Sequence, residues 1–186
     1  MTDHVLITGG AGFIGTRLAR RFVDAGHTVT VLDALIPQVH GDDPATTSPL
    51  LRSLEGVATV VHGSVTSVEK LREALTGANI VVHLAAETGT GQSMYEIDRY
   101  VETNVGGTAK LLDLLANEPT SVRRVVIASS RSIYGEGAYR ASDGTLLFPP
   151  HRDDAAMAAG DFDVQASGHG PLTMIPTDED AKLHPS

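Results

Sequence analysis

The sequence predicts an α/β fold in which a doubly wound parallel sheet carries helices on both faces, followed by a loop-rich tail. Three observations support this prediction. Up to about Ser130, short apolar runs alternate with segments of helical spacing, as in parallel sheets with crossover helices. A glycine-rich turn separates the first apolar run from the first helical segment, and the second run ends in Asp33. After Ser130 the apolar runs become brief and prolines gather.

Five apolar runs are expected to form the strands, and three segments of helical spacing the helices. The predicted strands are residues 5–8, 28–33, 58–62, 80–84 and 125–129. The predicted helices are residues 13–25, 68–75 and a long one at about 94–117. The polar segment 37–49 carries three prolines and is expected to be an irregular loop.

Residues 131–186 are expected to form a loop-rich tail or partial insertion, and residues 1–130 the sheet domain. The tail contains short acidic pairs and most of the prolines. Its apolar runs 162–164 and 172–175 flank Gly168-His169-Gly170, which suggests a β-hairpin.

Composition excludes several classes of partner. The formal net charge of −9 argues against binding to nucleic acid or to an anionic membrane. The absence of cysteine excludes disulfides and thiolate metal sites, and we expect no metal. No apolar run approaches the roughly 18 residues that a membrane span needs. A cytoplasmic protein is therefore expected.

The segment Thr8-Gly9-Gly10-Ala11-Gly12-Phe13-Ile14-Gly15 is the strongest functional signal. Glycines between a strand and a helix let the backbone approach a pyrophosphate, whose charge the N–H groups of the helix start bind. Asp33 lies at about the spacing at which a carboxylate binds the adenosine ribose, and it favours NAD because it repels the 2′-phosphate of NADP. The alternative is an ordinary glycine-rich turn. The combination favours a dinucleotide site.

Further segments, in the same order along residues 1–140, resemble the extended short-chain dehydrogenase/reductase family. Beyond the glycine loop and Asp33, the similar segments are His83-Leu84-Ala85-Ala86, Thr103-Asn104-Val105-Gly106-Gly107-Thr108 and the run from Val126 to Gly135. The resemblance is to its NAD-dependent nucleotide-sugar epimerases and dehydratases, which are built on a Rossmann-type sheet. Residues 87–95 look closest to the dTDP-rhamnose 4-epimerase-like members.

The resemblance implies a set of cofactor contacts and one catalytic residue. The residues implied to bind NAD are Gly9, Gly12, Phe13, Ile14, Gly15, Asp33, Ser64, Val65, Leu84, Ala85, Ala86, Thr88 and Asn104. Ser130 is implied to bond the reacting sugar oxygen. Ser64 stands where the family often has an Asp that binds the adenine amino group, so a neutral acceptor replaces a charged one.

The catalytic Tyr-x-x-x-Lys of this family is missing. The residues four places beyond the four tyrosines are Arg99, Asn104, Ala138 and Asp143. A tyrosine with a pKa near 10 needs a neighbouring cation to act as a base at neutral pH. The resemblance therefore implies that the chain stops short of its base and lacks the sugar-binding half.

The sequence is thus interpreted as the NAD-binding portion of an epimerase/dehydratase for a dTDP- or UDP-linked sugar, truncated and not catalytic alone. The alternatives are a non-catalytic NAD-binding regulatory module and a decayed fragment without function. Relatives commonly dimerise through the helix that corresponds to residues 94–117 together with the helix that carries Tyr-x-x-x-Lys. A homodimer through residues 94–117 is one expected assembly, and without the second helix the chain is expected to expose apolar surface and to associate weakly or aggregate.

Overall fold

A computed structural model describes residues 2–181 and 183. The chain divides into two compact units, Met1–Ala128 and Ser129–Ser186, and each is described here by itself.

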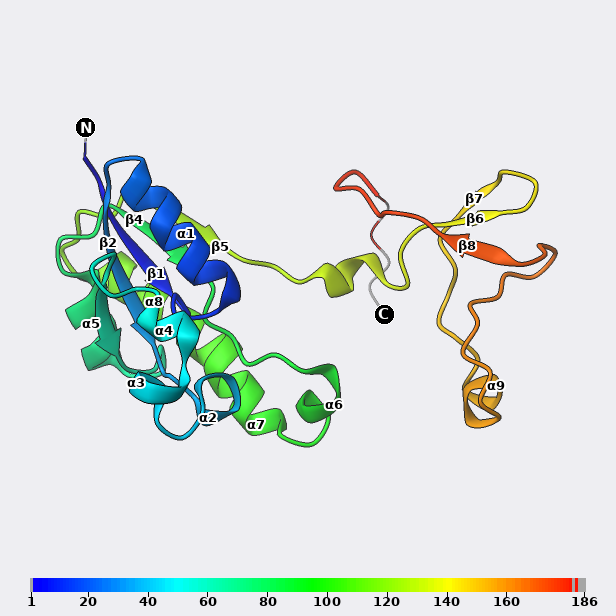
Figure 1. The fold of residues 1–186 in the computed structure, drawn as a ribbon, viewed down its shortest axis with the longest axis horizontal. Coiled ribbons are helices and arrows are strands. Elements are labelled where there is room, and N and C mark those ends of the chain that lie inside the picture. Colours follow the sequence, from blue (N-terminus) through cyan, green and yellow to red (C-terminus); the bar gives the residue numbers. More distant parts are fainter. Residues whose placement is uncertain (1, 182, 184–186) are drawn as a thin grey trace. The chain divides into compact units, whose positions relative to one another are not determined.

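The first unit is built on a sheet of five strands, all parallel, in the order β3-β2-β1-β4-β5. The strands are β1 (His4–Thr8), β2 (Thr28–Asp33), β3 (Thr59–His62), β4 (Ile80–His83) and β5 (Arg124–Ile127). The order reverses at β1, which pairs with β2 on one side and β4 on the other (Figure 1). The predicted doubly wound sheet is confirmed. Ligands of such sheets bind at the carboxyl ends of the strands, where the order reverses.

Helices cover both faces of this sheet, with a separate apolar core on each. On one face, Leu6 and Val81 of the sheet pack with Leu71 of α5 (Val68–Leu75) and Leu111 of α8 (Thr108–Asn117). The other face is covered by α1 (Phe13–Asp24), as Figure 1 shows. There, Val5, Ile7 and Val31 pack with Ala19 of α1. Because both faces are covered, β1 and β4 carry continuous apolar runs at residues 5–7 and 80–82, and the threonine at position 30 of β2 is buried as well.

Residues 37–49 are not the irregular loop that was expected. They lie in three one-turn helices, α2 (Pro37–His40), α3 (Pro44–Thr47) and α4 (Pro49–Arg52). Each begins at a proline, which fits the first helical position because the missing N–H would have no partner there. The prolines therefore start turns of helix.

The long helix predicted at about 94–117 begins at residue 97 and has a π-helical segment in its middle. α6 (Thr90–Ser93) ends before residues 94–96, which are not helical, and α7 (Ile97–Tyr100) follows. A π-helical segment, η1 (Val101–Gly107), then leads into α8, whose end at Asn117 agrees with the prediction. The π-segment contains Asn104, whose side chain is bonded to the loop after β4. Such π-segments often occur at functional sites.

The second unit holds an antiparallel sheet in the order β7-β6-β8, with a short 3₁₀ helix and a short α-helix. Its elements are η2 (Arg131–Tyr134), β6 (Tyr139–Ala141), β7 (Leu146–Leu147), α9 (Asp154–Ala158) and β8 (Leu172–Met174). The predicted hairpin between 162–164 and 172–175 is wrong, because β8 pairs with β6 and 162–164 is not a strand. Pairing with β6 brings β8 beside the buried Tyr139 and Ala141.

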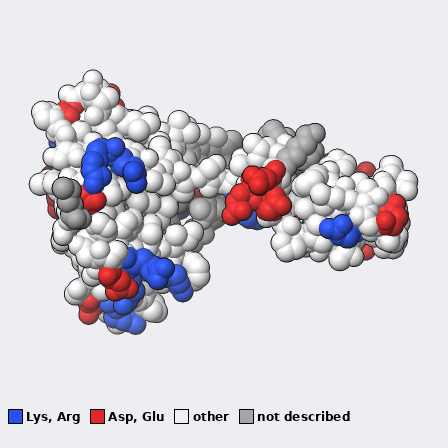
Figure 2. All heavy atoms as spheres, turned by 90° about the horizontal axis from the view of Figure 1, so that it is seen from above, with Lys and Arg blue, Asp and Glu red and all other residues white. Residues whose placement is uncertain are grey.

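Charged side chains are scattered in small groups over the face drawn in Figure 2, within a mainly uncharged surface. In the part of the chain that the structure describes, every helix is too short or too polar to cross a membrane.

Candidate functional site

The glycine loop lies at the carboxyl end of β1 and is held against both neighbouring strand ends. Gly9 has a φ of +66° and its N–H bonds the carbonyl of Leu32 at 2.8 Å. A Cβ at Gly9 would lie 2.8 Å from the backbone N and Cα of Ala85. Glycine is therefore required here both by the backbone conformation and by the close approach of the turn after β4.

The first turn of α1 packs directly on this loop. A Cβ at Gly15 would lie 2.5 Å from the Cα of Gly10, so the helix can approach the loop this closely only with glycine at that position. Among the described residues, no side chain caps α1 and its first turn has no acidic residue. The side chains of Phe13 and Ile14 are exposed. The start of α1 therefore presents backbone N–H groups and the positive end of a helix dipole to an anion.

The carboxylate of Asp33 is joined to the glycine loop. Its Oδ2 accepts a hydrogen bond from the Ala11 N–H at 2.9 Å, and its Oδ1 accepts one from the Leu35 N–H at 2.9 Å. The Asp33 side chain is 12% exposed. The structure thus brings together the two features that the sequence singled out, the loop for a pyrophosphate and the acidic residue for a ribose.

The buried side chain of His83, at the end of β4, contacts Thr8, the residue that precedes the glycine loop. His83 Nδ1 is 2.6 Å from Thr8 Oγ1, and its Nε2 is 3.0 Å from Thr108 Oγ1. Burial lowers the pKa of His83, which favours the neutral ring. Thr8 Oγ1 also accepts from the Ala85 N–H at 3.3 Å. His83 is thus a packed residue that links β1, β4 and α8.

Asn104 holds the loop that follows β4. Its Oδ1 accepts from the Glu87 N–H at 2.8 Å and its Nδ2 donates to the Glu87 carbonyl at 3.1 Å. The Tyr100 hydroxyl donates to the carbonyl of Thr88 at 3.0 Å. These bonds anchor the turn that contains Leu84, Ala85, Ala86 and Thr88, of which Ala86 and Thr88 are exposed.

The remaining predicted residues lie in different surroundings. Ser64 Oγ accepts a hydrogen bond from the Thr66 N–H at 3.1 Å. One of the two lone pairs of this oxygen is therefore already used. The Val65 side chain is buried, and a Cβ at Gly107 would lie 2.6 Å from its Cγ2, so only the Val65 backbone is left for a ligand. Ser130 belongs to the second unit, where its exposed Oγ accepts from the Ser132 N–H at 3.0 Å.

Sequence reasoning missed a buried histidine near Asp33. His40, in α2, is 3% exposed, and its Nε2 lies 3.7 Å from Asp33 Oδ1. The signal that was available is Ser48 before Pro49, a capping residue followed by proline that indicates a helix start in this segment.

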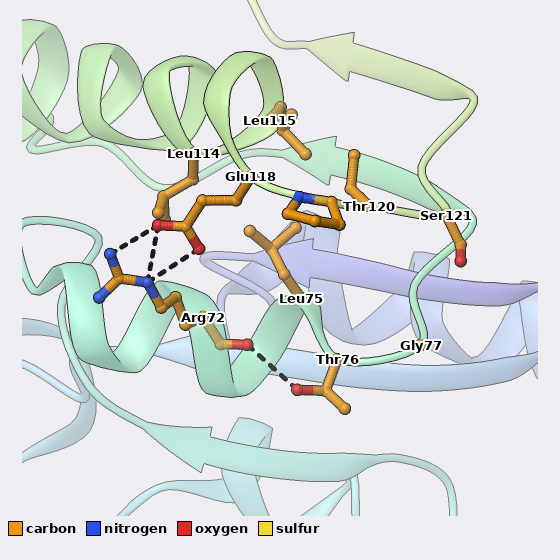
Figure 3. A pocket seen from close by; sticks show the side chains of 10 residues that line it. Arg72, Leu75, Thr76, Gly77, Leu114, Leu115, Glu118, Thr120 and Ser121 are labelled. Carbon is orange, nitrogen blue, oxygen red and sulfur yellow. Dashed lines mark hydrogen bonds and ion pairs between the residues drawn. The ribbon is translucent and has the colours of Figure 1, made fainter.

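A pocket of about 400 Å³ lies elsewhere on the first unit, between the C-terminal ends of α5 and α8 (Figure 3). Its wall includes Gly77 and Ser121, which precede β4 and β5, so it lies at the amino ends of these strands, opposite the glycine loop. Its charged residues, Arg72 and Glu118, are paired with each other at 2.6 Å. Among the described residues, no group of three His, Asp or Glu side chains could hold a metal ion.

Comparison with known proteins gives consistent matches. A family model described as the NAD dependent epimerase/dehydratase family matches residues 5–155. The chain is 36% identical over 178 residues to the dTDP-L-rhamnose 4-epimerase of Burkholderia thailandensis, covering 95% of this chain and 46% of that protein. It is 33% identical over 169 residues to a dTDP-glucose 4,6-dehydratase of Streptomyces griseus, covering 87% of this chain and 48% of that protein.

Solved structures agree with these sequence matches. The UDP-glucose 4-epimerase of Brucella ovis in complex with NAD aligns with a TM-score of 0.60 and 27% identity, over 78% of this chain and 42% of that one. A UDP-glucuronic acid 4-epimerase mutant of Bacillus cereus, in complex with NAD and a UDP-linked fluoro sugar, aligns with a TM-score of 0.61 and 28% identity, over 75% and 44%. The chain spans about half the length of the curated relatives it matches, or slightly less.

The close packing of Gly15 against Gly10 predicts a large difference between two glycine substitutions. Gly15→Ala should lower the free energy of unfolding of the first unit by about 1–3 kcal/mol, because backbone atoms must shift to admit the methyl group. Gly91→Ala is the matched control, since no atom lies within 4 Å of its Cβ position. Urea unfolding of both variants measures the difference, and equal stability would contradict this packing.

Proposed function

The chain belongs to the NAD-dependent epimerase/dehydratase family, and we propose that its first unit binds NAD in the glycine loop. The observation that carries this proposal is the hydrogen bond between the Ala11 N–H and Asp33, which joins an anion-binding loop to a carboxylate where the strand order reverses. Glycine at positions 9 and 15 is needed for the packing of this loop against the turn after β4 and against α1, because a Cβ there would meet backbone atoms. The glycine loop and Asp33, together called the cradle, offer the backbone N–H groups and the carboxylate that a dinucleotide requires.

In this proposal each part of the cradle recognises a different part of the dinucleotide. The backbone from Gly9 to Gly15 holds the pyrophosphate at the start of α1. Asp33 accepts hydrogen bonds from the adenosine ribose and disfavours NADP. Ser64 and the Val65 backbone lie on the adenine side, and residues 84–88, anchored by Asn104, on the nicotinamide side. NAD, when bound, supplies a hydride acceptor.

We propose a nucleotide sugar, linked to dTDP or UDP, as the substrate class of the full-length family protein. Two observations support this class: the similar proteins are named for dTDP- and UDP-linked sugars, and solved neighbours are in complex with such ligands. Ser130 would contact the sugar. No tyrosine of the sequence is followed four positions later by lysine. We therefore propose that this chain binds NAD without converting a sugar by itself.

A second candidate function is a non-catalytic module that uses NAD as a regulatory ligand. It is favoured by the complete cradle in a sequence without the Tyr-x-x-x-Lys pair. Both candidates require NAD binding and differ in whether a further polypeptide restores sugar conversion. The cytoplasmic location stays a prediction.

We also propose that two copies of the chain associate through the helical stretch from α7 to α8. Its exposed apolar residues are Ile97 at 63%, Val101 at 52%, Val105 at 63% and Leu112 at 44%. Ile97, Val101 and Val105 follow one another at about one helical turn, and Leu112 comes about two turns later. This spacing is consistent with a stripe along one face of the helix. Apolar stripes of this kind mark interaction surfaces.

The proposed NAD site predicts a calorimetric response that depends on Asp33. The purified chain should bind NAD more tightly than NADP. Asp33→Asn should weaken NAD binding about 10- to 100-fold, because a charged acceptor of ribose hydrogen bonds is lost. Asp24→Asn, an exposed carboxylate near the end of α1, should leave the affinity unchanged.

Two outcomes would contradict these proposals. No heat of binding at NAD concentrations of about 1 mM would reject the proposed site, since cofactor affinities lie below that range. Conversion of a dTDP- or UDP-linked sugar well above a control without protein would reject the claim that the chain is not catalytic alone.

The apolar stripe predicts that the chain associates at high concentration. In sedimentation velocity, the average mass should rise with concentration, and Val105→Glu should abolish the rise because a charge would be buried in the contact. Met174→Glu is the control, since Met174 is exposed but lies on β8 in the second unit. A wild-type chain that stays monomeric would contradict the proposed association.

A further inference from the structure

The segment after β2 encloses a histidine that none of the proposed cofactor contacts uses. His40 closes α2, and its side chain is 1% exposed. Its Nδ1 lies 2.8 Å from Ser48 Oγ, which also accepts a bond from the Leu51 N–H at 3.1 Å as the cap of α4. The ring is therefore held from one side by the start of another helix.

Ser48 is able to pair with the tautomer of the neutral histidine that carries its proton on Nε2. A serine oxygen that accepts from the Leu51 N–H still has its own O–H to donate, and His40 Nδ1 lies within reach. When Ser48 donates to Nδ1, the ring proton is on Nε2. That nitrogen lies 3.7 Å from Asp33 Oδ1. In this tautomer the Nε2–H faces the carboxylate at a distance beyond a direct hydrogen bond, and the interaction is that of a dipole with a charge.

The turn between α2 and α3 holds the backbone of His40 in place. Gly41 has a φ of +80°, and a Cβ there would collide with Thr47 Oγ1. The Thr47 hydroxyl donates to the His40 carbonyl at 2.6 Å. The backbone of His40 is therefore anchored as well as its ring.

The backbone of Leu35 contacts the same carboxylate oxygen, Asp33 Oδ1, independently of His40. Leu35 has a φ of +49°, the left-handed region that a residue other than glycine rarely adopts. In this conformation its N–H reaches Asp33 Oδ1 at 2.9 Å. Backbone strain of this kind persists where the surroundings hold it, often at ligand sites. A strained turn and a buried ring thus converge on Oδ1, while the glycine loop occupies Oδ2.

We propose that His40 is a positioning residue that, with Ser48 behind it, holds the Asp33 carboxylate in the orientation that recognises the 2′-hydroxyl of the adenosine ribose. This inference rests on the proposed NAD site. His40 acts through Asp33 and determines how strongly the site distinguishes a ribose from a deoxyribose.

Two substitutions of His40 test the roles of its two ring nitrogens separately. The amide nitrogen of glutamine can take the place of Nε2 as a donor, and the amide oxygen of asparagine can take the place of Nδ1 as an acceptor. His40→Gln therefore keeps a donor toward Asp33, whereas His40→Asn keeps the contact with Ser48 and removes the donor. The probes are NAD and its 2′-deoxyadenosine analogue, each titrated into the full chain by calorimetry, with the melting temperature of every variant measured alongside.

The wild-type chain should bind NAD about tenfold or more tighter than the deoxy analogue, since a hydrogen bond to a charged group is lost. His40→Gln should keep most of this ratio, and His40→Asn should reduce it to about twofold or less. A purely structural role of His40 would not move the ratio, because both probes would weaken equally. A His40→Asn chain with the wild-type ratio would overturn the proposal.

Ser48→Ala provides the same test should His40→Asn fail to fold, because it leaves the imidazole in place and removes its support. In Ser48→Ala, the ratio of the affinities for NAD and for the deoxy analogue should lie between the ratios of His40→Asn and of the wild type. A ratio equal to that of the wild type would again overturn the proposal. A wild-type chain that binds neither probe would instead reject the proposed NAD site, so the two failures are distinguishable.

Discussion

The hydrogen bond from the Ala11 N–H to Asp33 is the contact on which the candidate site depends. It ties the glycine loop to the end of β2, while the bond from the Gly9 N–H to Leu32 and the close contact of Gly9 with Ala85 tie it to both neighbouring strands. The start of α1 is then fixed because Gly15 packs on this loop. The helix start and the carboxylate that we propose to bind the pyrophosphate and the ribose are thereby held at one end of the sheet by contacts within the protein, an arrangement that would lower the entropic cost of binding.

Much of this arrangement could be predicted from the sequence, because its signals are local. Each parallel strand contains a short apolar run, and the glycine loop and Asp33 fall within one strand–helix–strand unit. The parts that could not be predicted depend on contacts between segments. His40 approaches Asp33 only because the prolines of 37–49 start turns of helix, and β8 pairs with β6, more than 30 residues earlier. The π-helical segment η1 also depends on such a contact, since its Asn104 is hydrogen-bonded to the backbone of Glu87 in the loop after β4.

The proposed NAD site and the family's catalytic motif differ in whether this sequence contains them. The glycine loop and Asp33 lie in the first unit, whereas the sequence has no Tyr-x-x-x-Lys pair and spans about half of its curated relatives. The pocket between α5 and α8 lies at the opposite end of the strands, and its paired Arg72 and Glu118 leave little charge to recognise a ligand. The carboxyl end of the sheet is therefore where recognition is expected, and the exposed stripe from α7 to α8 is where a second polypeptide would bind.

A titration of the ¹⁵N-labelled chain with NAD, followed by amide chemical shifts, distinguishes the glycine loop from the rest of the surface as the site of binding. The amides of residues 9–15 and of Leu35 should shift in proportion to occupancy, while those of Gly77 and Ser121 in the opposite pocket should not. Shifts confined to the opposite pocket, or none at about 1 mM NAD, would contradict the claim that the glycine loop and Asp33 form the binding site.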